Sequence, residues 1–228
     1  MPKAPNAQRL RAMPFVRLEL AVLTVKDGAL RILLGKRAEA PHAGKWALPG
    51  GVIRIDLDDD LIAGCQRVAM ERLGTKLSGL SQVCAVGARR RDPRAPWALS
   101  VVYRCMVPIE RLDASPGKRM EKLEWFVADQ AAADTSLAFD HSVLVAQAVE
   151  ATRSEFQSLR FPLDFLPEQF TLADLQATSE AVLGRRLDKS SFRRRLEDAG
   201  CVEALAGSMR TGAFRPAQLY RLRGVSQP

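Results

Sequence analysis

The alternation of apolar and polar residues in the last third of the chain predicts two consecutive helices. The first begins after Thr171, a start of the capping-box type, and places apolar side chains on one face at Leu172, Leu175 and Val182. The second follows a turn at 183–187 and covers the basic stretch from Leu187 to Ala199. Asp188 is suited to its N-cap and Gly200 to its C-terminal end, so the sequence marks both ends of this helix.

At about 100° per residue, the second helix has two distinct faces. Phe192, Leu196 and Ala199 form an apolar seam on one side, and Ser190, Arg193, Arg194 and Glu197 lie on the other. Two short strands follow at Cys201–Leu205 and Gln218–Leu222, around a glycine-containing hairpin that carries Arg210 and Arg215. A helix pair followed by such a hairpin is typical of a winged helix-turn-helix, whose second helix enters the major groove of DNA.

The charge distribution favours DNA as the partner of this segment. Residues 183–228 contain ten Lys or Arg against four Asp or Glu, whereas residues 158–182 are net acidic. We therefore expect the helix to read bases and the hairpin to hold the DNA backbone. The predicted DNA-binding residues are Lys189, Ser190, Arg193 and Arg194 on the helix and Arg210 and Arg215 on the hairpin. The alternative is a basic helix face that only meets solvent.

The front two-thirds of the chain alternates strands with helices and predicts an α/β domain. Strands are expected at Val16–Val25, Leu30–Arg37, Trp97–Val107 and Leu123–Val127, and helices at Asp60–Leu73 and His141–Leu159. The last helix carries an apolar stripe that runs towards the second domain, at Val145, Val149, Thr152, Phe156 and Leu159. We expect three parts: residues 1–14 as a flexible arm, 15–160 as the ligand-sensing α/β domain and 161–228 as the winged helix.

Composition limits the class of protein. The chain has 228 residues, a net charge of +8 and a pI near 9.7, which favours an anionic partner. Its four cysteines lie far apart and it has two histidines, so we expect buried free thiols, no metal site and no bound cofactor. The sequence has neither a signal-peptide pattern nor an apolar run of about 18 residues, which predicts a cytoplasmic protein without a membrane span.

One segment carries a recognisable motif. Gly44-Lys-Trp-Ala-Leu-Pro-Gly-Gly51 resembles the start of the Nudix box, whose end matches at Arg67, Glu71 and Gly74. Val68 and Arg72 stand where that family has carboxylates, and the interval from Gly51 to Arg67 is two residues longer than the pattern. Nudix hydrolysis needs clustered carboxylates to hold divalent metal ions. Their loss predicts a domain that binds a nucleotide diphosphate without hydrolysing it, with no catalytic residue.

Cations and glycines around this motif suit a diphosphate, because guanidinium groups bind phosphate oxygens and glycines allow close approach. The residues predicted to border the ligand are Arg37, Lys45, Trp46, Gly50, Gly51, Arg54, Arg67, Glu71, Arg89, Arg90 and Arg91. Several of these residues have an alternative role. Trp46 would be a core residue, and Arg67 and Glu71 would form an ion pair within one helix. Residues 89–91 would form a solvated turn or a second DNA contact. An enzyme alternative is a hydrolase with carboxylates relocated among Asp56, Asp58, Asp59, Asp60, Glu71 and Glu121.

The chain from Arg17 to Leu222 resembles the NrtR-type Nudix-related transcriptional regulators of NAD metabolism. The matching segments are Lys45–Val52 (KWALPGGV), Arg91–Arg94 (RDPR), Leu137–His141 (LAFDH), Phe170–Leu172 (FTL) and Phe214–Tyr220 (FRPAQLY). The resemblance implies a Nudix-like α/β/α sandwich and a C-terminal winged helix. It implies a homodimeric repressor of NAD synthesis or salvage genes, with ADP-ribose or a related nucleotide as effector. Phe214 departs from the family pattern, and related regulators of the same build sense other ligands, including sugars.

Two chains are expected to present two recognition helices to consecutive major grooves, about one helical turn or ~10 base pairs apart. The effector is expected to favour an interdomain arrangement that spaces these helices wrongly for the operator. A third functional class remains beside the regulator and the hydrolase: an adaptor that binds nucleic acid or protein without any ligand. Salt-sensitive binding to one palindromic DNA fragment separates the regulator from both alternatives, and release by a nucleotide separates it from the adaptor.

Overall fold

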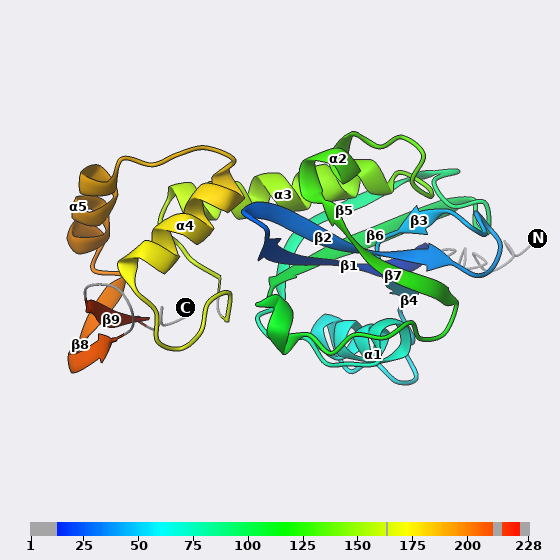
Figure 1. Ribbon diagram of the computed structural model, residues 1–228. Coiled ribbons are helices and arrows are strands. Elements are labelled where there is room, and N and C mark those ends of the chain that lie inside the picture. The colour runs from blue at the N-terminus through cyan, green and yellow to red at the C-terminus, as the bar shows by residue number, and fades with distance from the viewer. Residues whose placement is uncertain (1–12, 163, 212–215, 224–228) are drawn as a thin grey trace, which may run out of the picture.

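The computed structural model describes residues 13–162, 164–211 and 216–223. Two parts lie end to end along the molecule (Figure 1), a larger one built on a mixed sheet and a smaller one built on two helices and a two-stranded hairpin. This is the predicted fold class, an α/β/α sandwich followed by a winged helix-turn-helix. Residues 1–12 of the predicted N-terminal arm fall outside the described residues, as do Phe214 and Arg215.

The larger part is organised around strand β1. The strands are β1 (Phe15–Lys26), β2 (Ala29–Arg37), β3 (Trp46–Ala47), β4 (Gly50–Val52), β5 (Ser81–Arg89), β6 (Trp97–Met106) and β7 (Met120–Val127). Their order is β3-β2-β1-β6-β5, with β4 paired to β1 and β7 to β2. β1 runs parallel to β6 and antiparallel to β2 and β4. Asp27 and Gly28 both have positive φ, which gives the tight turn expected between the first two strands.

Helices cover both faces of this sheet (Figure 1), because the side chains of β1 alternate between two cores. Leu18, Leu20 and Val22 pack against helix α1 (Leu61–Leu73) on one face. Ala21 and Leu23 pack on the other face, which is covered by the helices α2 (Ala128–Ala133) and α3 (His141–Gln157). The expected apolar stripe of α3 is confirmed: Val145, Val149, Thr152, Phe156 and Leu159 are all buried.

The sequence expectation missed several elements. Strand β5, the short strands β3 and β4, helix α2 and a 3-10 turn at Ile109–Arg111 were not predicted. β5 shows little contrast between its two faces because it lies at the sheet edge and several of its exposed positions are the small residues Ala85, Gly87 and Ala88. β3 and β4 are two and three residues long, too short to carry a period.

The smaller part is a winged helix-turn-helix built from α4 (Leu172–Leu183), α5 (Lys189–Ala199), β8 (Val202–Arg210) and β9 (Ala217–Leu222). Thr171 and Asp174 form the capping box of α4, and Asp188 accepts the Ser191 N–H at the start of α5, as expected. Gly200 ends α5 in the left-handed conformation. One part of the predicted seam is wrong: Phe192 and Leu196 are buried, but Ala199 is exposed because it lies in the last turn, beyond the reach of the core.

A single hydrophobic core joins the two parts through the C-terminal half of α3. Phe156 packs edge-to-face on Phe161 and Phe165, and the same cluster continues to Phe170, Leu175 and Val182 of the winged helix. Two arginines add polar links. Arg153 of α3 donates to the carbonyl of Val182 at 2.9 Å, and Arg195 of α5 donates to the carbonyl of Gln157 at 2.5 Å. α3 is therefore fixed to both helices of the helix-turn-helix.

Candidate DNA interface and ligand site

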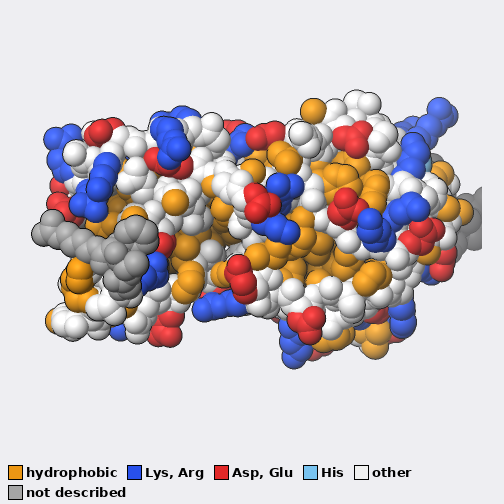
Figure 2. Space-filling view, in the orientation of Figure 1, with side chains coloured by type: hydrophobic (Ala, Val, Ile, Leu, Met, Phe, Trp, Pro, Cys, Tyr) orange, Lys and Arg blue, Asp and Glu red, His pale blue; other side chains and the backbone are white. Residues whose placement is uncertain are grey.

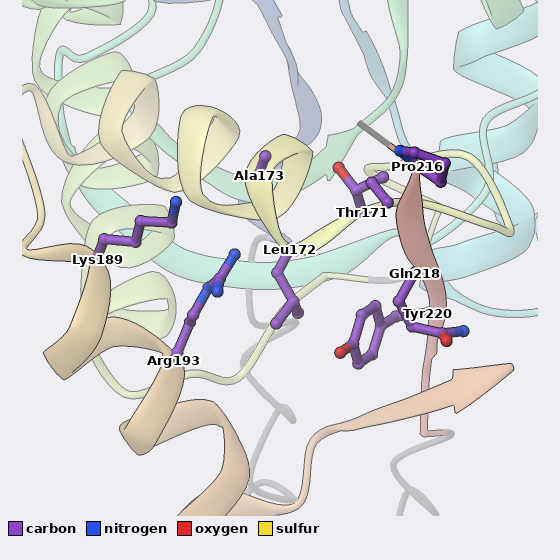
Figure 3. A pocket seen from close by; sticks show the side chains of 9 residues that line it. Thr171, Leu172, Ala173, Lys189, Arg193, Pro216, Gln218 and Tyr220 are labelled. Carbon is purple, nitrogen blue, oxygen red and sulfur yellow. The ribbon is translucent and has the colours of Figure 1, made fainter. Parts of the chain in front are cut away.

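The winged helix holds a cavity of about 480 Å³ between its two helices and β9. Figure 3 shows Lys189 and Arg193 extending from α5 towards the first turn of α4, with Tyr220 facing them from β9. The remaining lining residues are Thr171, Leu172, Ala173, Pro216, Ala217 and Gln218. Within the described part of the chain, neither Lys189 nor Arg193 takes part in an ion pair, so two cations face the amino end of a helix. That combination suits a phosphate.

The structure separates residues that the helical wheel had placed together on α5. Lys189, Ser190, Arg193 and Arg194 are all exposed, as predicted for a DNA-reading face. Lys189 and Arg193 line the cavity, whereas Arg194 lies opposite the buried pair formed by Phe192 and Leu196. Figure 2 shows Lys and Arg side chains over α4 and α5 at this end of the molecule, interspersed with Asp and Glu.

Among the described residues of the wing, an ion pair ties the hairpin to the helix pair. Arg210, at the end of β8, contacts the carboxylate of Asp174 at 2.8 Å, and both side chains are partly exposed. Asp174 also accepts the backbone N–H of Thr171 at 2.8 Å in the capping box of α4. Arg210 was predicted to contact the DNA backbone. In the structure its side chain already holds β8 against α4. The other predicted wing contact, Arg215, lies outside the described residues.

The predicted ligand residues fall into separate places, and those near α1 are held by the protein itself. Arg67 makes a double hydrogen bond to Asp58 at 2.6 and 2.7 Å and also contacts Glu71 at 3.3 Å. The hydrogen bond from Arg67 lowers the pKa of Asp58. The alternative in which Arg67 and Glu71 form a helix pair is confirmed, although Asp58 is the stronger partner. Arg54 is exposed and pairs with Asp56 at 2.7 Å.

The space above the two glycines is filled by side chains of the same chain. A Cβ at Gly50 would lie 1.7 Å from Oε2 of Glu19, and one at Gly51 would lie 2.8 Å from Cγ2 of Val68. Arg72 is buried and donates to the carbonyl of Gly50 at 2.9 Å and of Lys118 at 3.1 Å. Val68 and Arg72, which the sequence pattern is expected to place at carboxylate positions of the Nudix box, thus pack α1 against β4.

Most of the carboxylates considered for a relocated metal site have structural partners. Asp60 is the N-cap of α1, and Glu121 pairs with Lys36 at 2.9 Å. Asp56, Asp58 and Glu71 pair with arginines. In the described residues, no group of three or more His, Cys, Asp or Glu is placed so that it could hold a metal ion. All four cysteines are free, but only Cys65 and Cys105 are buried, so the expectation of buried thiols is wrong for Cys84 and Cys201.

A buried polar network lies on the α3 face of the sheet. Glu19 is fully buried and its Oε1 accepts from Arg17 at 2.7 Å and from Ser100 at 3.3 Å. His141, the first residue of α3, accepts the backbone N–H of Leu48 on Nδ1 at 2.9 Å, and its Nε2 lies 3.9 Å from Glu19. Burial lowers the pKa of His141 to about 4, so the ring is neutral at pH 7.

Arg91 joins this network and is not part of an exposed run. It makes a double hydrogen bond to Asp140 at 2.6 and 2.7 Å and donates to Ser100 at 2.6 Å. Its side chain is 6% exposed, whereas Arg89 and Arg90 lie exposed in the hairpin between β5 and β6. The exposure of Arg89 and Arg90 agrees with a solvated turn and with a second DNA contact alike. Both interpretations are wrong for Arg91, because Asp140 holds it inward.

Three arginines and two aromatic rings gather beside this network, and we call Arg17, Arg37, Arg94, His42 and Phe139 the Arg–Phe cluster. The guanidinium carbons of Arg37 and Arg94 lie 5.1 and 5.8 Å from the centre of the Phe139 ring. Burial and the charges of Arg17 and Arg94 lower the pKa of Arg37. Arg17 is paired with Glu19 and Arg94 with Asp92, so Arg37 is the cation of the cluster that has no ion-pair partner among the described residues. An anion would supply that partner.

The backbone of the Arg–Phe cluster is also unusual. Phe139 and His42 both have positive φ, at 55° and 62°, and their rings meet edge-to-face at 4.5 Å. A bulky residue rarely adopts this conformation, and such residues gather at functional sites. Arg94 is held in place by a double hydrogen bond to Asp92, which is 2% exposed. The hydrogen bonds from Arg94 outweigh the effect of burial and lower the pKa of Asp92.

Of the predicted ligand residues, Arg37 belongs to this cluster and Lys45 lies near it. The charge of Lys45 adds to the effect of burial in lowering the pKa of His42. Trp46 is half-buried and packs edge-to-face on Phe126 at 4.9 Å, which agrees with the core alternative. Sequence reasoning missed Arg17, Arg94 and Phe139 as ligand candidates. Arg94 belongs to the RDPR segment and Phe139 to the LAFDH segment. The motifs therefore indicated these segments but not their role as ligand candidates.

Comparison with known proteins gives matches to both parts of the chain. Residues 17–148 match the model of the NUDIX domain, and residues 162–222 match that of the NrtR DNA-binding winged helix domain. The chain is 36% identical over 208 residues to the ADPR responsive transcriptional repressor NtrR of Acinetobacter baylyi, covering 91% of this chain and 82% of that protein.

Two solved structures of Shewanella oneidensis NrtR are similar to this chain. The structure of that protein in complex with a 27mer DNA has a TM-score of 0.75 and 30% identity, and covers 91% of this chain and 93% of the other. The NUDIX domain of the same protein in complex with ADP ribose has a TM-score of 0.55 and 26% identity, over 64% of this chain and 94% of the other. Among the described residues, no helix is long and apolar enough to cross a membrane.

Proposed function

The chain belongs to the NrtR family of Nudix-related regulators, and we propose that it is an ADP-ribose-responsive repressor of genes for NAD synthesis or salvage. The single observation that carries this proposal is the connection through α3. This helix begins at the buried network beside the Arg–Phe cluster and ends against both helices of the winged helix. A relative in Acinetobacter baylyi is described as an ADPR responsive repressor, which supports the choice of effector. The protein works in the cytoplasm and needs no cofactor.

The Arg–Phe cluster is the proposed effector site. Arg17 and Arg94 are paired with Glu19 and Asp92, and Arg37 has no ion-pair partner among the described residues. A diphosphate supplies that partner to Arg37 and also accepts from the neighbouring guanidinium groups, which bind phosphate oxygens in pairs. The predicted residues near α1 take a structural role, because Arg67 and Arg54 both have carboxylate partners, whereas the cluster contains Arg37, which has none among the described residues. The proposed ligand residues are therefore the cluster together with Lys45, and the α1 side of the domain serves to support them.

The cavity between α4, α5 and β9 is the proposed DNA contact. Lys189 and Arg193 face the first turn of α4 and clamp a backbone phosphate there. Ser190 and Arg194, on the outward face of α5, read base edges in the major groove. One helix reads few bases, so we propose that the protein binds a palindromic operator as a homodimer, with half-sites about one helical turn apart.

Catalysis is not part of the proposed function. Nudix chemistry requires carboxylates that are free to hold metal ions. Val68 and Arg72 replace two of these carboxylates, and the guanidinium group of Arg72 donates hydrogen bonds to the carbonyls of Gly50 and Lys118. Glu71 accepts from Arg67 at 3.3 Å. We propose that this domain has lost hydrolysis and kept the ligand site on the other face of the sheet.

The effector acts by binding one arrangement of the two parts more tightly than the other. Binding at the Arg–Phe cluster displaces Phe139, which lies two residues before His141, and so shifts the start of α3. Arg153 and Arg195 carry the shift to α4 and α5. The spacing between the two recognition helices of the dimer then no longer fits the operator. Coupling of this kind is reciprocal, so operator DNA weakens effector binding by the same factor.

The test is operator binding in gel shift on the promoters next to the chain's own gene, with and without ADP-ribose, NAD and ATP. We expect salt-sensitive binding to a palindrome and release by ADP-ribose. Arg37→Ala and Arg94→Ala should abolish release and leave DNA binding intact. Arg54→Ala is the matched control, since this exposed cation pairs with Asp56 near α1. Loss of release with Arg54→Ala but not with Arg94→Ala would place the effector on the α1 side instead.

A further inference from the structure

We propose that the purine base of the effector is held in a separate apolar pocket at the mouth of the β5–β6 hairpin. The pocket has a volume of about 450 Å³ and is lined by Met13, Pro14, Phe15, Ala95, Pro96 and Trp97. This inference rests on the proposed function, because it assigns the part of the nucleotide that the Arg–Phe cluster does not explain. A flat aromatic base needs apolar and aromatic surface, whereas a diphosphate needs cations.

The chemistry of the lining fits a purine. Every side chain in it is apolar, and two are aromatic. Trp97 is 39% exposed and Met13 is 78% exposed, although large apolar side chains are normally covered. A ring stacked on the indole of Trp97 would cover this surface, and aromatic stacking accepts any base because every base has a π-face.

Trp97 is held in position by the strand beside it. Trp97 pairs in register with Arg89 across the hairpin, and a Cβ at Gly87 would lie 2.5 Å from Cη2 of its indole. The ring therefore occupies the space that the missing side chain of Gly87 leaves free. An indole fixed against a strand loses little freedom on binding a ligand, which favours stacking.

The pocket is continuous with the Arg–Phe cluster through two side chains. Phe15 lines the pocket, and the guanidinium carbon of Arg94 lies 5.1 Å from the centre of its ring. The same carbon lies 5.8 Å from the centre of the Phe139 ring. Arg94 thus connects the apolar pocket with the other two arginines of the cluster, Arg17 and Arg37. A nucleotide with its diphosphate on Arg37 and Arg94 would place its base on the Trp97 side.

The experiment is isothermal titration calorimetry of the full chain with two probes, ADP-ribose and inorganic pyrophosphate, which has no base. Trp97→Ala should lower the affinity for ADP-ribose about tenfold or more and leave pyrophosphate binding unchanged. Trp97→Phe should keep most of the affinity, since it retains an aromatic ring. Ile55→Ala is the matched control, because it removes another exposed large apolar side chain that does not line this pocket, and it should change neither affinity.

Each other outcome has a distinct meaning. If the native chain binds ADP-ribose and Trp97→Ala binds it equally well, the base pocket is wrong and the proposed function stands. If Trp97→Ala weakens both probes equally, the residue supports the fold and the pocket is again wrong. If Trp97→Ala turns a dimer into a monomer in sedimentation analysis, the pocket is covered by a second copy of the chain. If the native chain binds no nucleotide, the proposed function fails together with this inference.

Discussion

The backbone N–H of Leu48 donates to Nδ1 of His141 at 2.9 Å, and this bond joins residues 93 positions apart in the sequence. Leu48 belongs to the LPGG segment, and His141 is the first residue of α3. Because the ring accepts on Nδ1, the neutral form carries its proton on Nε2, which faces Glu19. The bond fixes the start of α3 to the connection between β3 and β4, so the helix that reaches the winged helix is anchored within the sensing domain.

The first prediction concerns pH. The pKa of His141 is lowered to about 4 by burial, from the ordinary value near 6.5. The unfolded state therefore binds a proton first, and stability that is fully present above about pH 6.5 is lost as the pH falls towards 4. The loss from this group is at most about 3 kcal/mol. Urea unfolding at pH 7 and pH 4.5 should show it in the native chain.

His141→Asn keeps an acceptor for the Leu48 N–H but does not titrate, so its stability should depend less on pH over this range. His42→Asn is the control: burial and the nearby charge of Lys45 lower the pKa of this ring too, but the ring is less enclosed than that of His141, so most of the dependence should remain. Identical pH dependence in His141→Asn and the native chain would show that another group is responsible.

The second prediction separates two adjacent arginines of α5. Arg194→Ala should cost roughly 1–3 kcal/mol on the operator and relax the sequence preference, since it removes a base contact. Arg193→Ala should weaken operator and random DNA about equally and lower the salt slope by about one, since it removes a phosphate contact from the cavity. Fluorescence anisotropy with both DNAs at several salt concentrations measures this. If Arg193→Ala relaxed the sequence preference and Arg194→Ala weakened all DNA equally, base reading would belong to the cavity side of the helix.

The third prediction concerns the wing. Arg210→Ala should lower the affinity for all DNA and reduce the salt slope by about one. Its pair with Asp174 is partly exposed, so the free energy of unfolding should fall by less than about 1 kcal/mol. Arg221→Ala removes a comparable pair with Glu203 from the same hairpin and serves as control. If Arg210→Ala and the native chain have equal salt slopes, Arg210 does not contact DNA and only holds β8 against α4.

The fourth prediction concerns coupling through α3. Arg153→Met removes the hydrogen bond to Val182 and the ion pair with Asp129 but keeps an apolar stem. We expect operator and effector each to bind nearly as before, while the factor by which one weakens the other decreases. Calorimetry with ADP-ribose, with and without operator, measures that factor. Glu150→Gln, at an exposed position of the same helix, should leave it unchanged. An unaltered coupling factor in Arg153→Met would exclude this arginine from the connection.

The fifth prediction is that the chain releases no AMP from ADP-ribose in the presence of Mg²⁺. The expected alignment with the Nudix box puts Val68 and Arg72 at two carboxylate positions, and Glu71 accepts from Arg67. The assay is product analysis by chromatography at high protein concentration, with Glu71→Gln as the control for contaminating hydrolase. AMP release that disappears in Glu71→Gln would establish a working Nudix centre.

The sequence by itself determined the elements whose signals are short-range. The capping box at Thr171, the N-cap at Asp188 and the glycine after α5 act within one helical turn, so their residues alone fix where the helices begin and end. The stripe of α3 follows from a period along one helix. The family motifs identified the RDPR and LAFDH segments, but they did not show what the residues of these segments contact.

Tertiary structure alone decided which of these residues meet. Arg17 comes from β1, Arg94 from the β5–β6 hairpin and Phe139 from the segment before α3, so no spacing along the chain predicts the Arg–Phe cluster. Arg67 was expected at the ligand because its carboxylate partner, Asp58, belongs to a loop whose course the sequence does not show. The helical wheel placed Arg193 and Arg194 on the same face. Arg193 lines the cavity and Arg194 does not, because α4 and β9 lie beside Arg193. Local order is set by neighbours within a turn, whereas a site depends on contacts between elements that are brought together only when the core closes.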